Sequence, residues 1–158
     1  MIKTPVTPPD LACRANKCSL LLGCLLLGGM LLSNLVQAHG NVVPQAVATD
    51  GLEQLGPEWR TENPYRTSKD HDKALEIGAS AYNQNCAACH GLEAKSGGIA
   101  PDLRLLDQGA AGDEWFVERV RNGAVRDGRV YMPKMADYLS QEALWAVRTY
   151  LDSVYTTE

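Results

Sequence analysis

The sequence predicts an all-α fold in which few helices are joined by long loops. Three stretches carry apolar residues at helical spacing, and no stretch shows the sustained alternation of apolar and polar residues that is typical of a strand. A separate apolar run lies near the N-terminus. With 158 residues, 45% of them hydrophobic and 22% charged, the chain has the composition of one globular domain with an extension.

The N-terminal segment, residues 1–38, is predicted to be an export signal. Basic residues precede an apolar run over residues 19–36, and cleavage is expected after Ala38. The alternative is an uncleaved membrane anchor, because the run is close to the roughly 18 residues that span a bilayer. We therefore expect a periplasmic protein that meets a membrane only if this segment is retained.

Removal of the segment changes both the charge and the cysteine count. Without its three basic and one acidic side chains, the remaining 120 residues hold 12 basic and 18 acidic groups, a formal net charge of −6. Binding of nucleic acid through its phosphates is therefore not expected. Two of the five cysteines remain, Cys86 and Cys89, which is too few for a disulfide scaffold.

Residues 39–69 are predicted to form an extended arm. Three prolines interrupt this segment, and no helical or strand period is sustained along it. Trp59 and Tyr65 are expected to pack the arm onto the domain that follows. The alternative is that these two aromatic side chains bind a partner.

The first helix is predicted over residues 70–85. Apolar positions recur there at intervals of three and four, and acidic residues near its start complement the helix dipole. Two rows of side chains share this spacing: Ala74, Ile77 and Ala81 in one, and Leu75, Gly78 and Tyr82 in the other.

A second helix is predicted over residues 113–122. Gly112 or Asp113 is expected to cap its start, and Gly123 is expected to end it, because glycine adopts the left-handed conformation of a helix stop. The loops before and after this helix contain glycine and proline and no regular period.

The last helix is predicted over residues 141–154, after Ser140, which is a favourable N-cap. Three helices within about 85 residues make a thin core for so much loop. We therefore expect a large apolar cofactor to fill the centre of the domain.

Residues 86–90 read Cys-Ala-Ala-Cys-His, which is the attachment signal for a c-type haem. Cys86 and Cys89 would form thioethers to the porphyrin, and the imidazole of His90 would bind the iron. A redox-active disulfide would need the cysteines before a helix in a βαβ setting, whereas this pair follows a helix. A structural zinc site would need four ligands at finger-like spacing, which the sequence lacks.

A second axial ligand is expected from a loop far along the chain. The histidines His39 and His71 and the methionines Met132 and Met135 are the candidates after residue 38. We favour Met132, because Pro133 keeps it out of a helix, and Met135 is the alternative. A methionine more often fills a core, and only the predicted haem makes a ligand the better interpretation.

Together these features resemble the class I c-type cytochromes over residues 73–154. The resemblance implies a class I cytochrome c fold over residues 70–158, wrapped around one covalently bound haem c, and an electron-transfer protein that is not an enzyme. The matching positions are Gly78, Tyr82, Cys86, Cys89, His90, Ile99, Ala100, Pro101, Leu103, Gly123, Met132 and Pro133.

The same resemblance implies roles for residues around the haem. The carbonyl of Pro101 would accept a hydrogen bond from Nδ1 of His90 and orient the ring, and Leu103 would pack on the haem. Gly78 would let the first and last helices cross closely. The aromatic neighbours expected at this crossing are Tyr82 from the first helix and Trp145 or Tyr150 from the last.

The arm resembles that of exported cytochromes c that serve quinoprotein alcohol dehydrogenases, in residues 41–47, 51–53 and 58–66. This resemblance implies a one-electron carrier between a PQQ-dependent alcohol dehydrogenase and a terminal oxidase or another cytochrome. One alternative is a membrane-anchored or fixed cytochrome subunit of a dehydrogenase complex. Another is an open-site haem enzyme such as a peroxidase, for which no distal His-Arg arrangement is readable.

Charge is unevenly distributed along the chain. Residues 116–135 carry a net charge of +3, and residues 50–93 carry −4. We expect the side of the predicted methionine loop to steer towards an acidic partner. The alternative is a solvated surface whose basic groups pair with the haem propionates, for which Trp115, Tyr131 and Arg126 are possible donors.

Overall fold

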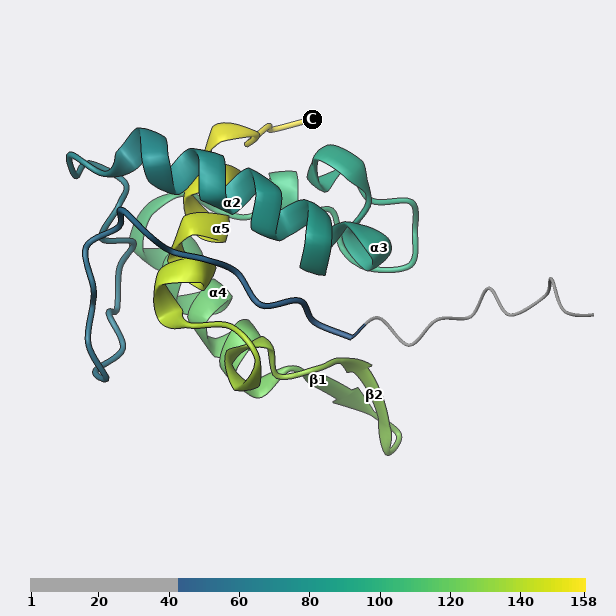
Figure 1. The fold of residues 1–158 in the computed structure, drawn as a ribbon. Helices are drawn as coiled ribbons and strands as arrows, with labels where there is room; N and C mark the ends of the chain where they lie inside the picture. The colour runs from purple at the N-terminus through teal and green to yellow at the C-terminus, as the bar shows by residue number, and fades with distance from the viewer. Residues whose placement is uncertain (1–42) are drawn as a thin grey trace, which may run out of the picture. The chain divides into compact units, whose positions relative to one another are not determined.

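The computed structural model describes residues 43–158, so the predicted export signal lies outside the described residues. Two antiparallel strands and several helices make up this part of the chain (Figure 1). No helix within it is long and apolar enough to cross a membrane. The elements are α2 (His71–Asn85), α3 (Ala87–His90), α4 (Gly109–Asn122), β1 (Ala124–Arg126), β2 (Arg129–Met132) and α5 (Gln141–Ser153), with 3-10 turns at Leu92–Ala94, Leu103–Leu105 and Met135–Asp137.

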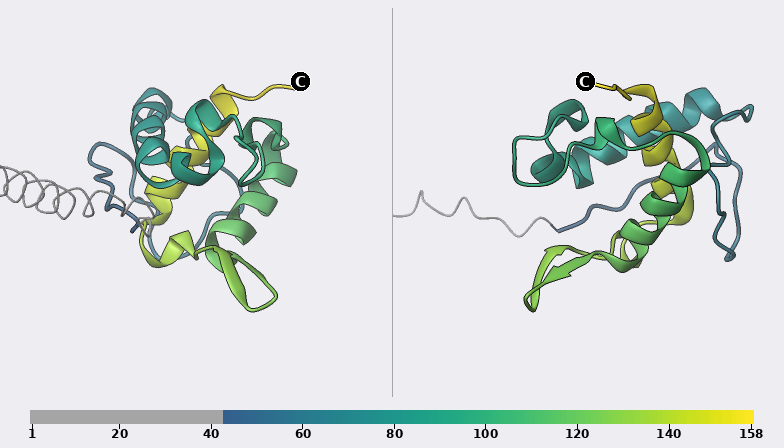
Figure 2. Two further views of the ribbon diagram at one scale, coloured as in Figure 1. Left: turned by 90° about the vertical axis from the view of Figure 1, so that its right-hand side faces the viewer. Right: turned by 180° about the vertical axis from the view of Figure 1, so that it is seen from behind.

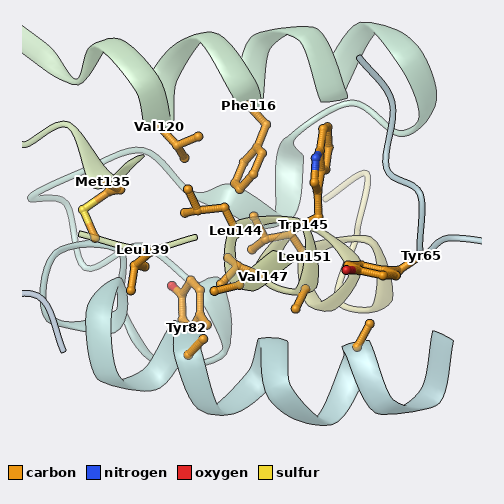
Figure 3. Packing of buried hydrophobic residues seen from close by; sticks show 14 of the residues in the cluster. Tyr65, Tyr82, Phe116, Val120, Met135, Leu139, Leu144, Trp145, Val147 and Leu151 are labelled. Carbon is orange, nitrogen blue, oxygen red and sulfur yellow. The ribbon is translucent and has the colours of Figure 1, made fainter. Parts of the chain in front are cut away.

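The core is built on the crossing of α2 and α5. Gly78 of α2 lies against the backbone carbonyl of Ala146 in α5, so closely that a Cβ would not fit. The rings of Tyr82 and Tyr150 lie 5.2 Å apart between centroids, which identifies Tyr150 as the aromatic neighbour at this crossing. Figure 3 shows buried side chains of α5 between Tyr82 on one side and Phe116 of α4 on the other. The predicted close crossing of the first and last helices is confirmed.

A Gly78→Ala variant is expected to lose about 2–3 kcal/mol of unfolding free energy, because the added methyl meets backbone that can move only if the two helices separate. Urea unfolding of the haem-loaded protein, followed by circular dichroism, measures this loss. Gly97→Ala is the matched control, since no atom lies within 4 Å of the Cβ it would gain. Equal stability of the two variants would contradict the packing described at the crossing.

The start of α4 differs from the prediction. The helix begins at Gly109, four residues earlier than expected, and Gly112 and Asp113 lie buried inside it. Gly112 lies against the carbonyl of Asp107 and the guanidinium of Arg148, so its small size serves packing. The expectation that Gly112 or Asp113 caps the helix is therefore wrong, because tertiary contacts determine both residues.

The end of α4 and the start of α5 agree with the sequence. Gly123 ends α4 with a φ of 66°, a positive value that glycine adopts readily because it has no Cβ. The hydroxyl of Ser140 accepts a hydrogen bond from the backbone N–H of Ala143 at 3.3 Å and so caps α5. Both predictions are confirmed.

The domain is mostly helical, as predicted, but the segment after α4 forms a short β-hairpin where a loop was expected. Val125 pairs with Val130, and Arg126 pairs with Arg129, in antiparallel register. Asp127 and Gly128 join the strands, and both have positive φ, as a two-residue hairpin turn requires. The dipeptide Asp-Gly was the sequence signal that could have found this hairpin.

The arm packs against the helices without forming a helix or strand within residues 43–70. Tyr65 is 1% exposed, and Trp59 is half-buried against the core, which confirms their predicted packing role. At the start of α5, the Glu142 carboxylate accepts a hydrogen bond from the backbone N–H of Leu55 at 2.9 Å. The neighbouring Gln141 bonds to the arm backbone through both its amide oxygen and its nitrogen. The arm is thus bonded to the same helix that forms the core.

One buried carboxylate joins the arm to two helices. Asp113 of α4 accepts hydrogen bonds from Arg66 at 2.7 and 2.9 Å, from Nε of Arg148 at 2.8 Å and from the backbone N–H of Asn63 at 2.9 Å. Both arginines also pair with Asp152 at 3.1 Å. The cluster therefore balances two cations with two anions and connects the arm, α4 and α5.

Candidate haem site

The two cysteines lie at the junction of α2 and α3. Cys86 follows the last residue of α2, and its backbone N–H donates to the carbonyl of Tyr82 at 2.8 Å, while Cys89 lies within α3. Both are free thiols, Cys86 half-buried against the core and Cys89 exposed. Burial and the neighbouring Cys89 raise the pKa of the Cys86 thiol to about 12. Within residues 43–158, no three His, Cys, Asp or Glu side chains gather as a metal site would require.

The ring of His90 is oriented by a backbone carbonyl. Nδ1 of His90 lies 2.9 Å from the carbonyl oxygen of Pro101. Because a carbonyl only accepts, Nδ1 carries the proton and donates it, which leaves the lone pair of Nε2 available for a metal. The Pro101 carbonyl therefore has the position, next to Nδ1 of His90, that the resemblance implied.

The chain directly after His90 is held by Tyr82. Its hydroxyl donates to the carbonyl of Gly91 at 2.7 Å. Burial raises the pKa of Tyr82, so the hydroxyl remains protonated and able to donate. Tyr82 of α2 therefore contributes both to the crossing of α2 and α5 and to the position of the loop that follows His90.

The two candidate methionines have different surroundings. Met135 is 5% exposed and lies beside Leu139 in the core (Figure 3). Met132 is the last residue of β2, is half-buried and lies at the edge of the same core. Its carbonyl lies close to Gly123, so a Cβ at that glycine would collide with it. The structure thus places Met135 among core residues and Met132 where its side chain borders a partly open surface.

The segments that carry His90 and Met132 lie on the same side of α5 (Figures 1 and 2). Large apolar side chains in these segments remain 53–80% exposed, so an apolar group bound between the segments would have side chains to pack against. Leu103, from the same loop as Pro101, is half-buried against the core. The exposed residues are Leu92, Ile99 and Leu105 in the loop after His90, and Val125, Val130, Tyr131 and Tyr138 around Met132.

Two of the three residues expected to be possible donors to the haem propionates lie together. The guanidinium of Arg126 lies 5.6 Å from the ring centroid of Tyr131, and both belong to the hairpin. Trp115 lies on α4, where Arg119 covers its ring at 5.3 Å. The guanidinium of Arg119 also donates to the carbonyl of Gly123 at 2.8 Å, a contact that the sequence did not signal.

The donor set fits a covalently attached haem. Two free thiols stand beside an imidazole with an available Nε2, the hairpin that carries Met132 lies on the same side of α5 as these residues, and both segments carry exposed apolar side chains. A site of this kind on a small helical domain defines a c-type cytochrome.

Comparisons with known proteins identify the family. Residues 73–151 match the family described as cytochrome C oxidase, cbb3-type, subunit III. The chain is 70% identical over 144 residues to cytochrome c550 of Pseudomonas aeruginosa, a match that covers 90% of this chain and 99% of that protein. The chain belongs to the class I c-type cytochromes. It is a monohaem electron-transfer protein that binds haem c covalently, and it is not an enzyme.

Two larger proteins of Pseudomonas putida are also similar. Quinohemoprotein alcohol dehydrogenase ADH-IIG is 33% identical over 117 residues, which cover 73% of this chain and 16% of that protein. Quinohemoprotein alcohol dehydrogenase ADH IIB is 32% identical over 113 residues, 67% of this chain and 15% of that protein. No solved structure matches the chain.

Proposed function

We propose that this cytochrome is a periplasmic one-electron carrier that accepts electrons from a PQQ-dependent alcohol dehydrogenase and delivers them towards a terminal oxidase or another cytochrome. The observation that carries the proposal is the length of the match to ADH-IIG. The part of the chain from residue 73, where the match to the family model begins, to the C-terminus is little more than half of the chain. The match to ADH-IIG covers 73% of the chain and therefore extends further towards the N-terminus. The similarity therefore includes much of the arm, beyond the region that the family model matches.

The proposed attachment uses Cys86 and Cys89 for the porphyrin and His90 and Met132 for the iron. The packing of Met135 in the core supports the choice of Met132. A haem iron with two protein ligands transfers single electrons with little rearrangement, and thioether ligation raises its reduction potential. Pro101 orients His90, and Leu103 would lie against the porphyrin.

Export is part of the proposal. Residues 1–38 have the basic start, apolar run and small residue of a cleavable signal. N-terminal sequencing of the protein from cells is expected to begin at His39. A retained segment would instead favour a membrane-anchored carrier or a fixed subunit of a dehydrogenase complex.

The charge distribution suggests how the carrier meets its partner. Arg126 and Arg129 stand opposite each other on the exposed hairpin, close to the proposed ligand Met132. The N-terminal end of α2, which carries Asp70 and Asp72, points away from the hairpin (Figure 1). Such an asymmetry orients a carrier during its approach to an acidic surface.

An Arg129→Gln variant is expected to accept electrons from the dehydrogenase about two- to fivefold more slowly at low ionic strength, which corresponds to the loss of one exposed charge interaction. The difference should shrink as salt rises, because the Debye length falls to about 10 Å at 0.1 M. Stopped-flow reduction measures both rates, with Arg60→Gln on the arm as the control. Rates that do not depend on salt would contradict steering by the hairpin.

The donor is tested by mixing the oxidised cytochrome with a purified PQQ-dependent alcohol dehydrogenase from the same organism. Reduction is expected only when an alcohol is added, and it should proceed through many turnovers. Failure of the dehydrogenase to reduce the cytochrome, while the dehydrogenase still reduces an artificial acceptor, would exclude this pathway.

A further inference from the structure

The loop after the proposed attachment site contains a hydrogen-bond network around Ser96 and Asp102. The hydroxyl of Ser96 accepts from the backbone N–H of Gly98 at 2.9 Å and donates to the carbonyl of Ala100. The backbone N–H of Ser96 donates to Oδ2 of Asp102 at 3.2 Å. The other carboxylate oxygen, Oδ1, accepts from the backbone N–H and from Nε of Arg104, both at 3.0 Å.

This network holds the chain on both sides of Pro101. Ala100 is fixed through its carbonyl, and Asp102 is fixed through its carboxylate. The pyrrolidine ring fixes φ of Pro101 itself. The direction of the Pro101 carbonyl, which accepts from Nδ1 of His90 at 2.9 Å, is therefore determined by the residues around it.

Arg104 connects the network to the rest of the fold. Its Nη2 pairs with Oδ2 of Asp102 at 2.9 Å, and its carbonyl accepts from the backbone N–H of Thr156 at 3.0 Å. The hydrogen bond from Arg104 lowers the pKa of Asp102 to about 2, so the carboxylate stays ionised near neutral pH. The loop is thus anchored on the segment that follows α5.

We propose that Ser96, Asp102 and Arg104 are positioning residues that hold the Pro101 carbonyl against His90 and so set the reduction potential of the cytochrome. The inference rests on the proposed role of His90 as an iron ligand. An acceptor on Nδ1–H raises the basicity of the imidazole, which favours the oxidised iron and lowers the potential. Loosening the network is therefore expected to raise the potential.

Ser96→Ala is the sharpest test, because it removes the hydroxyl without changing the charge. Exchange of the Nδ1 proton of His90 with solvent, followed by NMR in the reduced protein, is expected to become about two- to tenfold faster, as the loss of one ordinary hydrogen bond would give. The reduction potential is expected to rise, and Ser96→Thr, which keeps a hydroxyl, is expected to restore both values.

Arg104→Gln separates positioning from simple electrostatics. Loss of a positive charge by itself favours the oxidised iron and would lower the potential, whereas a loosened network raises it. Glu93→Gln is the control, since Glu93 is exposed in the same loop and forms no hydrogen bond or ion pair within residues 43–158. Glu93→Gln should leave the proton exchange of His90 unchanged.

The outcomes distinguish the inference from the function on which it rests. If Ser96→Ala leaves both proton exchange and potential unchanged in a protein with an unaltered visible spectrum, the positioning role is wrong. A lower potential in Arg104→Gln with unchanged exchange would also overturn it. If the ring protons of His90 in the reduced protein lack the large ring-current shifts of a haem ligand, the assignment of His90 itself fails.

Discussion

In a Met132→Ala variant, the far-red sulfur-to-iron charge-transfer band is expected to disappear, and the reduced protein is expected to bind carbon monoxide. Met132 lies half-buried at the end of β2, at the edge of the core, and is the proposed sulfur ligand of the iron. Its removal should also lower the reduction potential by a substantial part of the roughly 0.8 V range that axial ligands control. Visible spectra and potentiometric titration measure these changes.

Met135→Leu is the matched control for Met132→Ala. Met135 is buried in the core, and a swap that conserves volume should cost less than about 1.5 kcal/mol of unfolding free energy. The far-red band should remain, and carbon monoxide should not bind. Loss of the band in Met135→Leu, with the band retained in Met132→Ala, would reverse the assignment of the ligand.

An Asp113→Ala variant is expected to lose about 3–5 kcal/mol of unfolding free energy. Asp113 is fully buried and accepts hydrogen bonds from Arg66, Arg148 and the backbone of Asn63. Its removal leaves the buried guanidinium of Arg148 without its main partner. Urea unfolding at neutral pH measures the loss, and Glu114→Ala, an exposed neighbour on the same helix, should change stability by less than about 0.5 kcal/mol.

Removal of the Asp113 carboxylate is also expected to change how the unfolding free energy depends on pH. Burial by itself would raise the pKa of Asp113, but the hydrogen bonds from Arg66, Asn63 and Arg148 outweigh burial and hold the pKa below its ordinary value. The stabilisation is therefore complete above the unfolded pKa of about 3.9 and is lost as the pH falls through the folded pKa. Asp113→Ala should flatten the acid side of the stability curve, and a curve parallel to that of the wild type would contradict this role.

The helices with strong local signals could be predicted from the sequence. α2 has a long amphipathic period, and α5 has both that period and the N-cap Ser140, so both were found within one residue. α4 begins with the sequence Gly-Ala-Ala-Gly, which carries no capping signal. The packing of Gly112 against Arg148, which is distant in the sequence, determines this part of the helix.

The hairpin was missed because its strands are short. β1 and β2 have three and four residues, and Arg126 and Arg129 flank the turn, so no alternation is long enough to recognise. Only the turn residues Asp127 and Gly128 carried a signal. The buried cluster around Asp113 had no local signal at all, since Arg66 and Arg148 lie 47 and 35 residues away.

Some residues of the candidate site could likewise be predicted from the sequence, and others could not. The thiols and the imidazole follow from one contiguous motif, and the resemblance to a known family added Pro101. The network of Ser96, Asp102 and Arg104 depends on the path of the backbone between residues 96 and 104. Polar residues in a loop have many possible partners, so their mutual bonds became visible only in the structure.

The visible spectrum of the purified exported protein, oxidised and reduced, with and without carbon monoxide, tests the central claim most directly. A far-red sulfur-to-iron band in the oxidised protein, together with no response of the reduced protein to carbon monoxide, is the result that a closed His90–Met132 electron carrier predicts. A missing band with ready binding of carbon monoxide would contradict that claim and would indicate an open iron site.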